Sequence, residues 1–152
     1  MAIRDGQDTF SDSQALTAAA ASTNYKNHQA VRNMGIGNEL YIQTTIEVAL
    51  TDAGSNSTVT VDLQRDDNTS FSSATTVATL YTIAAVAAAG TTYEARVPID
   101  TSLPAGEWYY RIYYTMNNGD LSTGTVTTAI MANIRKYVAY AKNYVVSSTN
   151  QF

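Results

Sequence analysis

The sequence predicts an all-β protein, a single-domain jelly-roll-like β-sandwich, and three observations support this prediction. The length of 152 residues suits one domain. Segments in which apolar and polar side chains alternate recur along the chain, and clusters of Gly, Asn, Asp and Ser separate them. The composition is rich in Thr and in aromatic residues, including 11 Tyr, which is typical of sheets. Roughly seven or eight short strands in one small chain indicate a sandwich or jelly roll.

The first segment with a distinct composition is DTFSDSQALTAAAASTN, residues 8–24, in which Phe10 and Leu16 are the only sizable apolar side chains. Its Ala run favours a helix, although an isolated helix this short is marginal in water. Disorder is a second interpretation. An extended arm or edge strand lying on a neighbouring molecule fits best, because small side chains permit close backbone approach. We therefore predict that residues 1–24 form an N-terminal arm, with Phe10 and Leu16 as its contacts.

The body of the protein is predicted to span residues 25–134. Its clearest strand is LYIQTTIEVAL, residues 40–50, where the alternation places Leu40, Ile42, Ile46, Val48 and Leu50 on one face. The turn-rich TDAGSNS follows, and the next alternating segment completes a hairpin or meander. The run AAVAAAG at 84–90 is ambiguous between helix and strand. The remaining strands are predicted at 58–65, 75–84, 91–99, 107–116 and 121–134.

The predicted strand EWYYRIYYTM, residues 107–116, is bulky on both faces. Its second face carries Tyr109, Arg111 and Tyr113, whereas a solvent-exposed face is normally polar. Either a loop of the same chain covers this face, or the face meets another subunit, since Tyr and Arg are enriched in interfaces. Tyr109, Arg111 and Tyr113 are therefore candidate subunit-interface residues. The opposite face is formed by Trp108, Tyr110, Ile112, Tyr114 and Met116.

The C-terminal segment, residues 135–152, has a different pattern. Tyr137, Tyr140 and Tyr144 recur at helical spacing, but the sequence beyond them favours extended backbone. We predict that this segment packs on the body or on a neighbour through its aromatic side chains, with its secondary structure left open.

Charge and composition argue against several classes of partner. The net charge is −4 and the pI is about 4.7, which disfavours binding to nucleic acid or to an anionic membrane surface. The chain has no cysteine, so neither a disulfide nor a thiolate ligand is expected. Neither a signal peptide nor an apolar run long enough for a membrane span is found. We expect a soluble protein made in the cytoplasm.

Residues that could support catalysis are scarce. His28 is the sole histidine, it lies in a polar run, and no GxSxG motif accompanies it. The two glycines of MGIGN, residues 34–38, are more typical of a turn than of a phosphate loop. Asp66, Asp67 and Asn68 lack the ligand spacing of an EF-hand. We therefore expect no enzyme activity, no catalytic or metal site and no cofactor.

Three segments, taken in order, are more specific than the overall composition. They are DTFSDSQALTAAAASTN, then residues 40–76 from LYIQTTIEVALTDAGS to DDNTSFSSATT, then MNNGDLSTGTVTTAI at 116–130. Together they resemble the capsid cement, or decoration, proteins of tailed bacteriophages, and most closely the Bordetella-phage cement protein type. The resemblance extends over roughly residues 7–134 and depends on the ordered set rather than on any one segment.

The resemblance implies a jelly-roll-like fold, no catalysis, and a homo-oligomer, with a dimer favoured and a trimer second. It also implies a place on the outer surface of the virion, after synthesis in the host cytoplasm. There the protein would bind the major capsid protein and bridge its subunits, stabilising the head against internal DNA pressure. On this interpretation Phe10 and Leu16 are candidate shell contacts.

The alternative function is that of a carbohydrate-binding jelly-roll module of a phage adhesin. Trp108 and the tyrosines would then stack on sugar rings, and Asp66, Asp67 and Asn68 would bond sugar hydroxyls.

Overall fold

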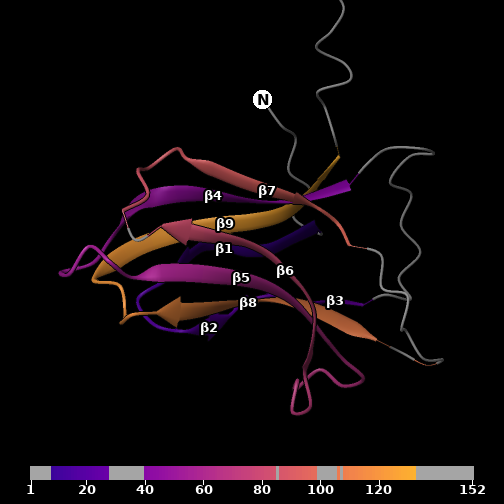
Figure 1. Ribbon diagram of the computed structural model, residues 1–152. Helices are drawn as coiled ribbons and strands as arrows, with labels where there is room; N and C mark the ends of the chain where they lie inside the picture. Colours follow the sequence, from indigo (N-terminus) through magenta and orange to yellow (C-terminus); the bar gives the residue numbers. More distant parts are fainter. Residues whose placement is uncertain (1–7, 28–39, 85, 99–105, 107, 133–152) are drawn as a thin grey trace, which may run out of the picture.

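The computed structural model describes residues 8–27, 40–84, 86–98, 106 and 108–132 (Figure 1). This part of the chain contains nine β-strands and no α-helix, and the run 86–90, left open by the sequence, is a turn-containing connection. The strands, in chain order, are β1 (Thr9–Ala15), β2 (Ala20–Ala21), β3 (Lys26–Asn27), β4 (Leu40–Thr51), β5 (Thr58–Asp66), β6 (Thr75–Ala84), β7 (Thr92–Arg96), β8 (Tyr109–Asn117) and β9 (Thr123–Ala132).

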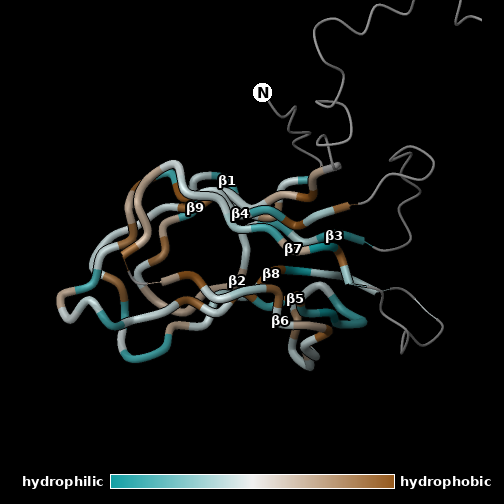
Figure 2. Tube along the Cα trace, turned by 45° about the horizontal axis from the view of Figure 1, so that its top comes forward, coloured by the Kyte–Doolittle hydropathy of each residue, from teal (hydrophilic) through white to brown (hydrophobic). Residues whose placement is uncertain are grey.

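The strands form two antiparallel sheets that lie as two layers (Figure 2). The first sheet has the order β1-β9-β4-β7, and the second has the order β2-β8-β5-β6, with β3 also pairing with β8. If β2 and β3 are counted as two pieces of one interrupted strand, each sheet has four strands. Successive strands then alternate between the sheets, except that β5 and β6 pair within the second sheet, and this is the order of a jelly roll. The predicted all-β sandwich is confirmed.

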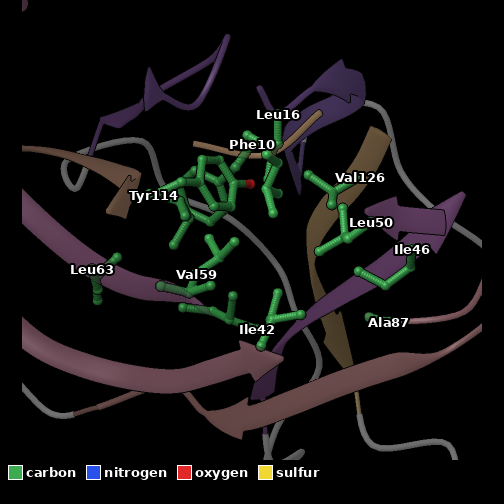
Figure 3. Close-up of a cluster of buried hydrophobic side chains, with 14 residues drawn as sticks. Phe10, Leu16, Ile42, Ile46, Leu50, Val59, Leu63, Ala87, Tyr114 and Val126 are labelled. Carbon is green, nitrogen blue, oxygen red and sulfur yellow. The ribbon is translucent and has the colours of Figure 1, made fainter. Parts of the chain in front are cut away.

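Alternation along β4 and β5 explains most of the core. Ile42, Ile46 and Leu50 of β4 point between the sheets, and Val59 of β5 meets them from the opposite layer (Figure 3). Val61 of β5 is buried in the same cluster. Closing the sandwich over these side chains removes them from water, which is the main stabilising contribution to such a fold.

Val48, which the alternation placed inward, is 51% exposed. Register shifts interrupt the β4–β9 pairing on both sides of Val48. Each such irregularity changes which face the following side chain occupies. The prediction for Val48 was therefore wrong, although the strand itself is present.

The N-terminal segment belongs to the sandwich. β1 pairs antiparallel with β9, the Leu16 amide donates to the Gly124 carbonyl oxygen at 2.9 Å, and β2 pairs with β8. Phe10 and Leu16 are 1% and 0% exposed and lie in the central cluster (Figure 3).

The predicted arm on a neighbour is corrected for residues 8–24, because this segment forms an edge strand of its own chain. Phe10 and Leu16 are core residues rather than surface contacts, since burying these two large apolar side chains between the sheets removes them from water. Residues 1–7 of that arm and the C-terminal segment 135–152 lie outside the described residues.

A chain of hydroxyl groups crosses the core between the two sheets. The Tyr114 hydroxyl donates to Thr128 Oγ1 at 2.8 Å and lies 2.8 Å from Ser11 Oγ. Thr44 Oγ1 continues the chain, 2.6 Å from Thr128 Oγ1 and 2.8 Å from the Tyr81 hydroxyl. Burial raises the pKa of both tyrosines, so their hydroxyls remain protonated and able to donate. The chain joins β1, β9 and β4 of one sheet to β8 and β6 of the other.

Tyr114→Phe is expected to lower the free energy of unfolding by about 1–3 kcal/mol, because it leaves the buried Ser11 and Thr128 hydroxyls each short of a partner. Urea unfolding followed by circular dichroism measures the change. Tyr113→Phe, on the outward side of the same strand, is the matched control and should change stability little. Equal losses in the two variants would show that the hydroxyl chain contributes no specific stability.

Candidate interaction surface

The described part of the chain has the features of neither a metal centre nor a membrane-spanning helix. Within it, no three or more His, Cys, Asp or Glu side chains come together as metal ligands would. Nor does any helix in this part have the length and apolarity needed to cross a membrane. His28 lies outside the described residues.

The candidate interface residues lie together on the outer face of the second sheet. On β8, Ile112 and Tyr114 are buried against the core, so Tyr109, Arg111 and Tyr113 share the opposite, outward side and are half-buried. The pairing of β8 with β5 places them opposite Asp66, Gln64 and Asp62, respectively. The sequence therefore correctly predicted that these three residues share one face.

The loop between β5 and β6 covers one end of this face. Its Phe71 is only 9% exposed and lies 6.0 Å from the Tyr25 ring, centroid to centroid. Tyr25, itself 47% exposed, meets Tyr109 edge to face at 5.6 Å. We call Tyr25, Phe71, Tyr109, Arg111 and Tyr113 the aromatic–arginine cluster. A covering loop was one of the two interpretations of this face, and it is observed for part of it.

Tyr25 and Phe71 were missed as members of this cluster. Phe71 did carry a signal, because it is the only large apolar residue in the polar loop DDNTSFSS. Tyr25 lies in a polar run with no periodicity, so only the tertiary structure could place its ring against Phe71 and Tyr109.

Asp66 holds the covering loop in place. Its carboxylate accepts hydrogen bonds from the Ser73 amide at 2.8 Å, the Ser73 hydroxyl at 3.0 Å, the Asp67 amide at 2.7 Å and Asn68 Nδ2 at 2.8 Å. Burial tends to raise the pKa of Asp66, but the hydrogen bonds from Ser73 and Asp67 outweigh it, so the pKa is lowered and the group is ionised near neutral pH. Phe71 adopts a left-handed backbone conformation, with φ of 52°, at the turn that these bonds enclose.

This geometry weakens the carbohydrate alternative. The Asp66 carboxylate, which was to bond sugar hydroxyls, is buried and binds its own loop. One face of the Trp108 ring, which was to stack on a sugar, has the Arg65 guanidinium over it at 5.0 Å.

Arg111 lies at the centre of the aromatic–arginine cluster, bonded to Gln64 and flanked by two aromatic rings. Its Nε donates to Gln64 Oε1 at 3.0 Å, and its guanidinium carbon lies 4.5 Å from the Phe71 ring centroid and 5.3 Å from that of Tyr113. Burial lowers the pKa of Arg111, and Tyr113 and Asp66 partly offset that shift; an arginine nevertheless stays charged in proteins. A guanidinium fixed between aromatic rings at a surface is the kind of residue that dominates protein–protein contacts.

A family model described as Bbp16 matches residues 10–130, which is most of the chain and includes strands from both sheets. No curated protein matches the chain.

Proposed function

This chain belongs to the Bbp16 family, and we propose that it is a cement, or decoration, protein that binds the outside of an assembled phage head. The observation that carries the proposal is the extent of the family match, residues 10–130, together with a family name that suggests a Bordetella phage protein. Membership in this family is consistent with a phage structural protein. We propose the more specific cement role in addition, with the major capsid protein as the partner and the outer surface of the virion as the location.

The fold supports a role that requires resistance to unfolding. Both sheets share one core, and the N-terminal strand is fastened into it by Phe10 and Leu16. A protein that binds only the assembled shell stabilises it by mass action, by about 2.7 kcal/mol per site at a hundredfold excess over Kd. Because a head repeats the same site many times, a modest affinity becomes substantial resistance to internal pressure.

The proposal also includes a homo-oligomer, with a dimer favoured and a trimer second. The support for it is the aromatic–arginine cluster, in which Tyr109, Arg111 and Tyr113 remain the proposed subunit contacts. An oligomer whose sites match the lattice spacing gains avidity from simultaneous binding. The acidic net charge gives no support for nucleic acid or an anionic membrane as a partner. Phe10 and Leu16, being buried, are no longer proposed as shell contacts.

Co-sedimentation with purified, undecorated and expanded heads of the cognate phage tests the cement role. We expect saturable binding at a ratio fixed by the icosahedral lattice, and heads that rupture at a higher temperature once decorated. Heads already saturated with their decoration protein are the control and should take up none. Absence of binding at micromolar protein would contradict the proposal.

A further inference from the structure

We propose that Arg111 of one copy of this chain pairs with Asp62 of a second copy, and reciprocally, across the outer face of the second sheet. The inference rests on the homo-oligomer of the proposed function and specifies the contact that would hold it.

Arg111 has donors to offer a partner. Its Nε is occupied by Gln64, but its two Nη groups donate no hydrogen bond to any residue that the structure describes. The rings of Phe71 and Tyr113 fix the plane of the guanidinium. A planar guanidinium with open N–H groups matches a carboxylate, which can accept two parallel hydrogen bonds from it.

Asp62 offers the matching acceptor on the same face. Its Oδ1 accepts a hydrogen bond from the Thr79 hydroxyl at 2.6 Å, while its Oδ2 accepts none from the described residues. Asp62 pairs with Tyr113 across the strands and Arg111 pairs with Gln64, so Asp62 and Arg111 are diagonal neighbours. Diagonal neighbours in a sheet lie about 7–8 Å apart. They form no ion pair among the described residues, where Arg111 instead bonds Gln64 and lies against the rings of Phe71 and Tyr113.

The charge balance of the face favours a second copy over other partners. Among the outward residues of β5, β6 and β8, the formal charges are Arg111, Asp62 and the loop-binding Asp66. A purely acidic partner would be repelled by Asp62, and a purely basic partner would be repelled by Arg111. Because Asp66 is buried against its own loop, the face presents one cation and one anion to a partner, and a two-fold contact can pair them reciprocally.

The geometry of face-to-face sheets is compatible with this pairing. A two-fold axis lying in the contact plane and passing between Arg111 and Asp62 brings each against the other in the second copy. Packed sheets lie about 10 Å apart, a separation that one long and one short side chain can span together. The neighbouring outward residues Thr60 and Thr115, which pair across β5 and β8, add no charge to oppose the contact.

A charge exchange tests the pairing, with self-association measured by sedimentation velocity on the full chain. Arg111→Glu and Asp62→Arg, each alone, should weaken self-association by about 100-fold or more, because each change places two like-charged pairs in the contact. The double variant Arg111→Glu/Asp62→Arg should restore association to within about tenfold of wild type. The matched control, Arg111→Glu/Asp67→Arg, has the same net charge as the double variant but the wrong position, and should stay dissociated.

Several outcomes would overturn the inference: a wild-type chain that is monomeric, single variants that associate normally, or equal rescue by Asp62→Arg and Asp67→Arg. Circular dichroism melts show whether each variant is folded. If Arg111→Glu does not fold, Asp62→Arg still tests the pairing independently. Head binding distinguishes this inference from the cement proposal. If the charge exchange behaves as expected but the protein does not bind heads, the pairing is supported and the cement role is contradicted. If the protein is a monomer that binds heads, the cement role is supported and the pairing is contradicted.

Discussion

Replacing Phe10 with alanine is expected to lower the free energy of unfolding by about 3–5 kcal/mol. The Phe10 side chain is 1% exposed and forms part of the cluster shared by both sheets, so its removal leaves a cavity as well as losing buried apolar surface. A loss of this size is a large fraction of the total stability of a small domain. Urea or guanidinium unfolding measures it directly.

Tyr25→Ala is the control for the Phe10 variant, since it removes an aromatic side chain that is half-exposed instead of buried. It should cost much less stability. The result that would contradict the core assignment is a Phe10→Ala protein of unchanged stability that no longer binds heads. That result would return Phe10 to the role of a shell contact.

The second large effect is expected at Gly124, where β9 passes close to β4. A Cβ atom added to Gly124 would lie 2.2 Å from Leu50 Cδ2 and 3.4 Å from Leu50 Cα, and Leu50 is fully buried. Gly124 also has a φ of 152°, which side-chain-bearing residues rarely adopt. Gly124→Ala should therefore cost about 2–4 kcal/mol, from overpacking together with backbone strain.

Gly90→Ala separates the two contributions at Gly124. Gly90 also has a positive φ, 85°, but a Cβ there would meet nothing within 4 Å. It should show the strain alone, about 1–2 kcal/mol. Thermal or urea unfolding of both variants gives the difference, and equal losses would show that Leu50 repacks without cost.

The burial of Phe10 and Leu16 limits which surfaces of the protein could bind a phage head. With Phe10 and Leu16 in the core, the described N-terminal segment is not free to lie on the shell, so contacts must come from surfaces of the finished sandwich or from residues outside the described ranges. The aromatic–arginine cluster is the proposed contact with a second copy of the chain rather than with the shell. Its loop is fastened by Asp66, which makes the surface preformed and limits the entropy lost on binding.

The candidate surface was partly predictable from sequence. Bulky side chains on both faces of residues 107–116 indicated that Tyr109, Arg111 and Tyr113 point outward together, because strand side chains alternate with a strict period of two. Nothing local indicated that Phe71 would cover Arg111, or that Asp62 would lie beside it. Those neighbours come from the register of β8 on β5 and from the fold of the β5–β6 loop.

The sequence by itself determined the fold class and most of the strands, because the alternation that specifies a strand is a local property of residues such as Ile42, Ile46 and Leu50. It also determined the acidic charge and the resemblance to phage cement proteins. Only the tertiary structure decided where residues 8–24 lie and why Val48 faces outward. β1 pairs with a strand more than a hundred residues away, and neither a distant partner nor a register shift leaves a signal in the local pattern.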